Sequence, residues 1–316
     1  MRKALIIGIN DYSFSPLGAC IPDANRMANI LSKNYDESPN FVCKKLISSD
    51  IAIYIATLKQ EIESLFADDS DVALFYFSGH GSEANGANKS CLVTQDAKEY
   101  SAGVELDFLI TTATNSKAKN IVIILDCCFS GAAGNNAFLK NVSLLREGIT
   151  ILTSSHESQV SFEGSDGGVF TDIVVQALDG GAADTLGFVT VAAIYSFADK
   201  LLGPWQQRPI FKANIKSMIP LRRCKPLIPI EILRKLPIYF KDKNDSLQLD
   251  PSFEPEAEPK GHENEKIFSD LQKYNRTSLL VPVGEEHMYF AAINSKSCVL
   301  TTLGKYYWTL AKESKI

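Results

Sequence analysis

Two patterns of apolar residues alternate along the first 215 positions of the chain. Short apolar runs predict strands, and the runs at 73–77 and 121–125 are continuous, which is typical of strands covered on both faces. Between these runs, apolar residues recur at intervals of three and four, as in amphipathic helices. The alternation predicts a mostly parallel sheet flanked by helices, with the two continuous runs at its centre.

The individual elements follow from these patterns and from local start and stop signals. Strands are predicted at 4–9, 41–47, 72–77, 121–126, 149–153 and 209–212. Helices are predicted at 22–31, 51–66, 105–112, 169–178 and 189–202.

The composition changes after about residue 240. A polar, mostly acidic stretch with three prolines is typical of a flexible linker. Apolar periodicity returns at Ile267 and predicts a helix, strands at 278–283 and 288–293, and a final helix. We therefore predict a domain at 1–215, a connecting segment and acidic flexible linker at 216–266, and a small C-terminal module at 267–316.

Composition and charge exclude several classes of protein. The 316 residues are 45% hydrophobic and 22% charged, which is ordinary globular usage. No apolar run approaches the roughly 18 residues that cross a bilayer, and the N-terminal run is shorter than a signal-peptide core. The net charge of -5 gives no general attraction for nucleic acid. Seven cysteines, an odd number at irregular positions, favour free thiols in a reducing cytoplasm over a disulfide framework.

Two predicted strands end in residues that can carry chemistry. One leads into Ser-Gly-His-Gly at 78–81, and the other into Asp-Cys-Cys at 126–128. Because the carboxyl ends of parallel strands meet at one edge of a sheet, we expect His80 and Cys128 to lie close together. A histidine within hydrogen-bond reach activates a thiol, and the N–H groups of Gly81 and Cys128 would form an oxyanion hole. The combination predicts a Cys–His hydrolase, although either residue alone would more often be an ordinary packed side chain.

Six short motifs occur together in one known family. They are GINDY (8–12), LGACIPDA (17–24), FYFSGHG (75–81), DCCFSG (126–131), ILTSSHESQVSFE (151–163) and GGVFTDIVVQAL (167–178). Together they resemble the caspase-fold cysteine peptidases, most of all the metacaspase and bacterial orthocaspase branch. The resemblance covers roughly residues 1–215 and implies a three-layer α/β/α domain with a mostly parallel six-stranded sheet. The spacing of His and Cys agrees with that of animal caspases, but DCCFSG departs from their nucleophile motif.

The resemblance implies roles for individual residues. His80 is the general base or acid, and Cys128, rather than the neighbouring Cys127, is the nucleophile. No third acid is obligatory in this family, and neither a cofactor nor a metal ligand set is implied. The implied substrate-binding residues are Cys20, Asp23, Ser78 and Asp126.

These substrate-binding residues bear on specificity. Animal caspases line the primary pocket with arginines and cut after Asp, whereas two carboxylates, Asp23 and Asp126, could clamp a guanidinium by charge-assisted bonds. The resemblance therefore implies a protein substrate with Arg, or less well Lys, before the cut. Asp23 has an alternative interpretation as an acid favoured by the dipole of a helix first turn.

Regulation is predicted from the same resemblance. Family members often cleave their own chain between the nucleophile and the next strand. In this chain, residues 139–145 of that segment also fit an ordinary amphipathic helix. The candidate self-cleavage sites are Lys140, Arg146 and Lys260. Calcium activates many metacaspases through acidic side chains, so calcium activation stays open. The candidate acids are Asp96, Glu105 and Asp107.

The last fifty residues look like a winged-helix fragment, in which two short strands precede LTTLGKYYWTLAKE. Because acidic residues dilute the few lysines, we expect this module to contact a regulatory protein rather than nucleic acid. By analogy with small bacterial proteases that carry an extra module, we expect a cytoplasmic effector of cell death or of defence, including antiviral defence. Two alternatives stay open: a catalytically idle scaffold or sensor acting through the module, and a transcriptional regulator.

Overall fold

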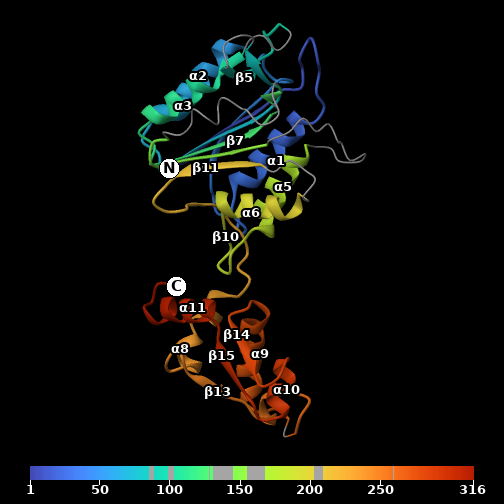
Figure 1. Ribbon diagram of the computed structural model, residues 1–316, viewed down its shortest axis with the longest axis vertical. Coiled ribbons are helices and arrows are strands. Elements are labelled where there is room, and N and C mark those ends of the chain that lie inside the picture. Colours follow the sequence, from blue (N-terminus) through green and yellow to red (C-terminus); the bar gives the residue numbers. More distant parts are fainter. Residues whose placement is uncertain are drawn as a thin grey trace. The chain divides into compact units, whose positions relative to one another are not determined.

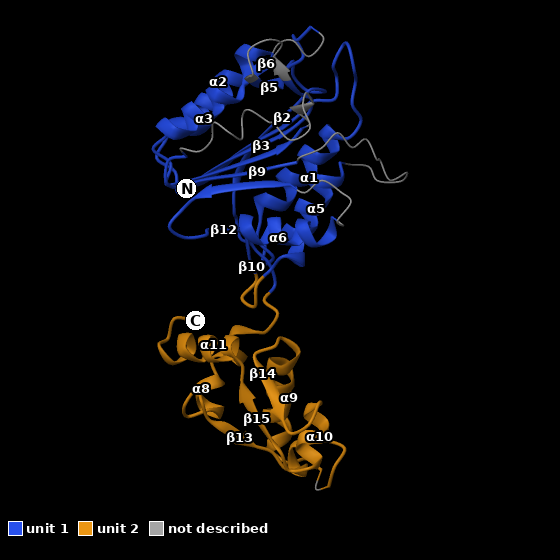
Figure 2. Ribbon diagram, in the orientation of Figure 1, with its two compact units in different colours: residues 1–183, 188–225 blue, residues 184–187, 226–316 orange. Residues whose placement is uncertain are grey.

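The computed structural model describes residues 1–84, 89–98, 103–127, 129–130, 145–154, 168–202, 209–258 and 260–316. The chain divides into two compact units (Figure 2). Unit 1 comprises Met1–Ala183 and Phe188–Lys225, and unit 2 comprises Asp184–Gly187 and Pro226–Ile316. None of the helices in the described ranges is long and apolar enough to cross a membrane.

Unit 1 is built on a six-stranded sheet with the order β11-β9-β7-β3-β1-β2. Neighbouring strands are parallel except β11, which runs antiparallel to β9. The strands are β1 (Arg2–Gly8), β2 (Val42–Ile47), β3 (Val72–Ser78), β7 (Asn120–Asp126), β9 (Ile149–Thr153) and β11 (Ile210–Asn214). The predicted mostly parallel six-stranded sheet is confirmed, with β3 and β7 in its interior.

Helices cover both faces of this sheet. They are α1 (Cys20–Ser32), α2 (Ile55–Ala67), α3 (Leu106–Asn115), α5 (Val169–Gln176), the π-helical turn η2 (Ala177–Gly181) and α6 (Val191–Leu201). Figure 1 shows α2 and α3 on one face and α1, α5 and α6 on the other. The predicted arrangement of helices around the sheet, in three layers, is therefore confirmed.

The two central strands explain the continuous apolar runs. Alternate residues of a strand point to opposite faces, so each run supplies two cores. Phe75 and Ile123 are buried in the core under α2 and α3, whereas Leu74 and Val122 are buried in the core under α1, α5 and α6. A strand that is covered on both faces buries its side chains on both sides, so polar residues are expected mainly at its ends.

Unit 1 also contains short strands that the apolar pattern did not predict. A four-stranded sheet has the order β6-β5-β4-β8, and a separate pair is formed by β10 and β12. These strands are β4 (Gly81–Ala84), β5 (Lys89–Val93), β6 (Gly103–Glu105), β8 (Phe129–Ser130), β10 (Phe188–Thr190) and β12 (Pro220–Arg223). Strands of two to five residues hold too few side chains to show a period.

Unit 2 has its own core around a three-stranded antiparallel sheet of order β13-β15-β14. Its strands are β13 (Ser246–Gln248), β14 (Leu280–Val283) and β15 (Ser297–Leu300). Its helices are α7 (Ile230–Leu233), α8 (Leu236–Tyr239), the 3-10 turn η3 (Pro251–Phe253), α9 (Asn264–Arg276), α10 (Met288–Ile293) and α11 (Thr302–Lys312). The loop 184–187 also belongs to this unit, because Leu186 packs against its core.

Two sequence-based expectations differ from unit 2. Residues 226–266, expected to lie in a connecting segment and flexible linker, form part of the compact unit, because Phe240, Leu249 and Phe253 are buried in its core. These apolar residues are too widely spaced in a polar stretch to produce a recognisable period. The strand expected at 288–293 is the helix α10, whose short apolar run is equally compatible with either structure.

Close packing at the end of β1 generates a stability prediction. A Cβ atom at Gly8 would lie 2.3 Å from the Cys20 carbonyl oxygen and 2.8 Å from Ala24 Cβ, so Gly8→Ala forces α1 away from the sheet. We expect a loss of about 1 to 3 kcal/mol in the free energy of unfolding of unit 1, measured by calorimetry. Gly18→Ala is the matched control, since no atom lies within 4 Å of its Cβ position. Equal unfolding temperatures for the two variants would contradict this packing.

Candidate active site

The ends of β3 and β7 bring the predicted site residues to one place. The two strands are parallel neighbours, and their register pairs Ser78 with Asp126. Beyond the strands, the Gly79 N–H donates to the Asp126 carbonyl over 3.4 Å. Strand β4 then pairs in parallel with β8, which sets Gly81 opposite Phe129. The segments that carry His80 and the Asp-Cys-Cys motif therefore leave the sheet side by side.

His80 is held by its backbone and by its ring. Its N–H donates to the Tyr12 hydroxyl (3.1 Å), and its Nε2 lies 2.7 Å from the Ser15 carbonyl oxygen. The ring packs against Tyr12 and Phe14, with centroids 4.6 Å and 6.0 Å away. A carbonyl oxygen can only accept a hydrogen bond, so Nε2 carries the proton and Nδ1 is the basic nitrogen.

The surroundings of His80 also set its protonation. Burial lowers the pKa of the imidazole below its ordinary value, and the Ser15 carbonyl partly opposes this effect. The ring is therefore mainly neutral at neutral pH, as a base must be to accept a proton.

Gly79 allows Tyr12 to reach this position. A Cβ atom at Gly79 would lie 2.6 Å from the Tyr12 hydroxyl and 2.8 Å from the Phe77 ring. The same hydroxyl donates to the Val93 carbonyl over 3.1 Å, so Tyr12 links β3, β5 and the His80 backbone. The small residue before the histidine is explained by this close approach.

Cys128, the predicted nucleophile, lies outside the described residues, as does Lys140. Its neighbours can be placed: Cys127 is 3% exposed and packs in the core beneath α2 and α3. Phe129 begins β8 and pairs with Gly81, as described above.

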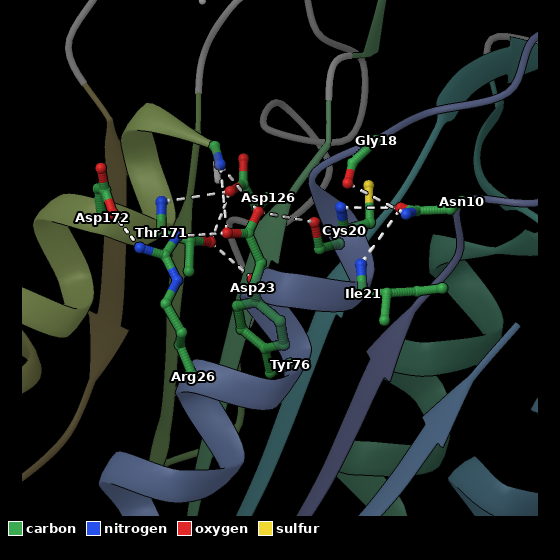
Figure 3. Close-up of polar contacts among 12 residues, drawn as sticks. Asn10, Gly18, Cys20, Ile21, Asp23, Arg26, Tyr76, Asp126, Thr171 and Asp172 are labelled. Atoms are coloured by element: carbon green, nitrogen blue, oxygen red, sulfur yellow. Dashed lines mark hydrogen bonds and ion pairs between the residues drawn. The ribbon is translucent and has the colours of Figure 1, made fainter. Parts of the chain in front are cut away.

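A second group of residues gathers beside the strand ends (Figure 3). Asp23, in the first turn of α1, is 1% exposed, and one of its oxygens lies 3.5 Å from Ser78 Oγ. Asp126 ends β7, and its Oδ2 accepts from the Thr171 hydroxyl (2.6 Å) and the Thr171 N–H (3.2 Å). Three of the four predicted substrate-binding residues therefore lie together, on three elements.

The fourth, Cys20, begins α1 one turn before Asp23. Its sulfur is buried, and burial raises the pKa of this thiol to about 12, helped by the two nearby carboxylates. A thiol with this pKa stays protonated and cannot act as a nucleophile at neutral pH.

The N-terminus of α5 lies directly against the two carboxylates. The Gly168 N–H donates to both oxygens of Asp23, at 3.2 and 3.1 Å. A Cβ atom at Gly168 would lie 3.0 Å from Asp23 Oδ2 and 3.1 Å from Asp126 Oδ2. We call Asp23 and Asp126 the acidic pair, because the Oδ2 atom of each approaches this one point beside Gly168.

Burial is the main influence on the acidic pair. It raises the pKa of Asp23 to about 6, against hydrogen bonds from Arg26 and Gly168 that favour the charged form. It also raises the pKa of Asp126, against hydrogen bonds from Thr171 and Ser154. The Asp126 carboxylate also raises the pKa of Asp23, as a like charge in the same site does.

Several residues of this site were not predicted from sequence. Asn10 Oδ1 accepts from the N–H groups of Cys20 (2.9 Å) and Ile21 (3.2 Å), so it caps α1 from a distance and fixes the turn that carries Asp23. Arg26 pairs with Asp23 and with Asp172 of α5. The three-residue spacing of Asp23 and Arg26 on a predicted helix was a usable signal for that ion pair. Nothing local could show that Gly168 and Thr171 reach the same carboxylates.

The candidate self-cleavage sites have different surroundings. The Arg146 guanidinium donates to the carbonyl oxygens of Ser116 (3.0 Å) and Ala118 (2.8 Å) and is only partly exposed. Lys260 is exposed, in a turn before α9 of unit 2. Arg146 is therefore engaged in the fold, whereas Lys260 is accessible.

The candidate calcium ligands do not form a group. The Asp96 carboxylate accepts from Ile55 N–H at the start of α2 and from the Thr94 hydroxyl. Glu105 and Asp107 line an open groove of about 690 Å³ beside α2 and α3. Within the described part of the chain, no three His, Cys, Asp or Glu side chains are placed to hold a metal ion.

Comparison with known proteins agrees with this fold. Residues 1–219 match the model of the caspase domain, Peptidase C14, and the chain therefore belongs to this family. Metacaspase-1 of Plasmodium falciparum is 32% identical over an alignment of 159 residues, and the match covers 43% of this chain and 25% of that protein. Metacaspase-5 of Trypanosoma brucei brucei is 29% identical over an alignment of 150 residues, and the match covers 41% of this chain and 29% of that protein. The matched segments thus cover less than a third of either relative.

Solved structures show the same fold. Caspase-1 from Spodoptera frugiperda has a TM-score of 0.51 at 12% identity, over 71% of this chain and 90% of that one. A protein of Geobacter sulfurreducens has a TM-score of 0.52 at 16% identity, over 72% of this chain and 98% of that one. Unit 1 is accordingly a caspase-like α/β domain.

The raised pKa of Asp23 makes stability depend on pH. Because the folded-state pKa (about 6) exceeds the ordinary value of 3.8, the fold binds this proton more tightly than the unfolded chain does. The stabilisation is present below pH 4 and is lost as the pH rises through about 6. We expect the stability of the wild type relative to Asp23→Asn to fall by about 2 to 3 kcal/mol between pH 4 and pH 7.5.

Denaturant unfolding at several pH values measures this difference. Asp50→Asn, at an exposed acid before α2, is the control and should show no such pH-dependent change. A difference between wild type and Asp23→Asn that is constant with pH would contradict the raised pKa.

Proposed function

We propose that the chain is a cysteine endopeptidase that cuts proteins after Arg, and less well after Lys. The observation that carries the proposal is the acidic pair: the buried carboxylate of Asp23 and the partly buried one of Asp126, whose Oδ2 atoms both approach one point beside Gly168, at the sheet edge that also holds His80. A guanidinium is planar and carries several donors, so it can bond both carboxylates at once. An aspartate side chain at the same place would meet two like charges.

In the proposed mechanism, Cys128 Sγ gives its proton to His80 Nδ1 and attacks the scissile carbonyl carbon. The N–H groups of Gly81 and Cys128 stabilise the resulting oxyanion. His80 then gives the proton to the leaving amine, and the C–N bond breaks to leave a thioester. Water, deprotonated by His80, hydrolyses this acyl-enzyme and restores the thiol. The hydrogen bond from Nε2–H to Ser15 keeps Nδ1 as the nitrogen that exchanges protons throughout.

The four substrate-binding residues have distinct proposed roles. Asp23 and Asp126 supply charge, while Ser78 and Cys20 leave room because they are small. Ser78 also contacts Asp23, which supports its place in the same pocket. The match to the family's motifs at these positions supports the assignment to the pocket of the residue before the cut.

The cellular setting is proposed from the resemblance and the domain organisation. We propose a cytoplasmic effector in bacterial defence, including antiviral defence, or in cell death, with unit 2 contacting a regulatory protein. A catalytically idle scaffold, the competing function, predicts no peptide cleavage at all.

Matched fluorogenic peptides that differ only at the residue before the cut test the specificity. We expect kcat/KM for the Arg peptide to exceed that for the Asp peptide by about 100-fold or more, because a buried like-charge contact costs several kcal/mol. Asp126→Asn and Asp23→Asn should each lower the Arg preference by about 10-fold or more.

Variants at the two proposed catalytic residues, Cys128 and His80, test the mechanism with the same peptides. Cys128→Ala and His80→Ala should abolish cleavage of the Arg peptide, while Cys43→Ala, at a half-buried thiol on β2, should leave it unchanged. Preferential cleavage after Asp would contradict the proposed pocket, and activity in Cys128→Ala would contradict the nucleophile.

Self-processing is proposed at accessible basic residues. Because its guanidinium is bound to two backbone carbonyls, Arg146 should resist cleavage in the folded protein, whereas Lys260 is exposed and Lys140 remains a candidate. Intact-mass spectrometry of the incubated wild type should show fragments ending at Lys260 or Lys140, and Cys128→Ala should show none. A fragment ending at Arg146 would overturn this order of accessibility.

A further inference from the structure

Arg26 forms two ion pairs beside the acidic pair. It lies one turn after Asp23 on α1, and its Nη2 is 2.5 Å from Asp23 Oδ1. Its Nη1 pairs with Asp172 Oδ1 on α5. The guanidinium therefore joins the two helices on either side of the acidic pair, as Figure 3 shows.

A buried carboxylate needs such a partner to stay charged. Asp23 is 1% exposed and lies beside a second, partly buried carboxylate, Asp126. Both burial and this neighbour favour the protonated form of Asp23, which cannot clamp a cation. Among the described residues, the ion pairs of Asp23 involve Arg26 and no second cation.

The other groups that face Asp23 are neutral or acidic. They come from α1, β3, β7 and the start of α5: Cys20, Tyr76, Ser78, Asp126 and the Gly168 N–H. Asp172 acts on Asp23 only through Arg26.

The two oxygens of Asp23 share the Gly168 N–H as a donor, but their other neighbours differ. Oδ1 accepts from Arg26, whereas Oδ2 approaches Ser78 and the point that it shares with Asp126 Oδ2. A guanidinium bound between the two Oδ2 atoms would thus leave the Arg26 contact in place. Arg26 is consequently placed beside the proposed substrate position rather than in it.

We propose that Arg26 is the resident counter-ion of the acidic pair: it keeps Asp23 ionised and oriented before a basic substrate side chain arrives. Arg26 is thereby a positioning residue that determines the pH range over which the pocket accepts Arg. This inference rests on the proposed function, because it assigns Asp23 to substrate binding.

Loss of the counter-ion should act on binding and not on the chemical step. The pKa of Asp23 is about 6 with Arg26 present, and removal of Arg26 raises it further, so more of Asp23 is protonated near neutral pH. KM for an Arg peptide should then rise most at low pH. We expect kcat to stay unchanged, because the ion pairs of Arg26 among the described residues are with Asp23 and Asp172 and not with His80.

Steady-state kinetics of Arg26→Met across pH 6 to 9 test this. We expect KM for the Arg peptide to rise about 3-fold at pH 6.5 but to stay within about 10% of wild type at pH 9, with kcat within about 2-fold of wild type throughout, as an increase of about one unit in the pKa of Asp23 implies. Arg26→Lys, which keeps the charge but cannot bridge two carboxylates, should restore most of the affinity. Arg223→Met is the matched control, because it breaks a similar partly exposed ion pair, with Asp36.

The outcomes separate this inference from the proposed function. If the wild type prefers Arg but Arg26→Met shows the same KM at every pH, or an equal rise at every pH, the counter-ion role is wrong and the proposed function stands. If the wild type cleaves no basic peptide, the proposed function is wrong. Unfolding measurements without substrate then still test whether Arg26 is the counter-ion of Asp23.

For that case, a double-mutant cycle of Arg26→Met and Asp23→Asn measures the coupling between the two side chains without substrate. The ion pair exists only when Asp23 is ionised, so the coupling should be larger at pH 8 than at pH 5. Equal coupling at both pH values would overturn the counter-ion role.

Discussion

The parallel pairing of β3 with β7 is the constraint on which the rest of the structure depends. Both strands are covered on both faces, so a shift of one residue would exchange the two sets of core side chains, and the register is strongly specified. That register sets Ser78 beside Asp126 and sends the histidine segment and the Asp-Cys-Cys segment out of the sheet together. The pairing of Gly81 with Phe129 continues the alignment beyond the sheet edge. The position of the chemistry thus follows from hydrophobic packing well below it.

Keeping both members of the acidic pair ionised is energetically unfavourable. Ionisation is opposed because the two carboxylates lie near each other, with Asp23 buried and Asp126 partly buried. Donors from two helices counter this: Arg26 on α1, and the Gly168 N–H and Thr171 at the start of α5. Residues that stabilise the fold alone would be better apolar at these positions. Among the described residues, Arg26 is the cation that pairs with this acidic pair. Two carboxylates retained here are better explained by recognition of a cation from outside, and the proposed specificity supplies one.

The apolar pattern predicted the six strands of the main sheet and the helices around it, because side chains buried on two faces or along one helix face leave a period in the sequence. It failed where that period is absent. The strands β4 and β8 are too short to show one, and Phe240, Leu249 and Phe253 stand far apart in the polar stretch expected to be a linker. In the site, the residues at the strand ends were predicted from the sequence. The contacts of Asn10, Gly168 and Thr171 were not, although these residues lie in the quoted motifs, because they act across sequence separations that only the folded chain brings together.

The central claim is that Cys128 is a nucleophile served by an acidic pocket. Peptide chloromethyl ketones alkylate such a thiol only when the side chain before the reactive group fits the pocket, so intact-mass and peptide mass spectrometry after labelling test the claim most directly. The account predicts that an arginyl reagent adds once, on Cys128, that an aspartyl reagent does not, and that Asp126→Asn reduces the labelling rate. Equal labelling by the aspartyl reagent, or addition to another of the seven cysteines, would contradict it.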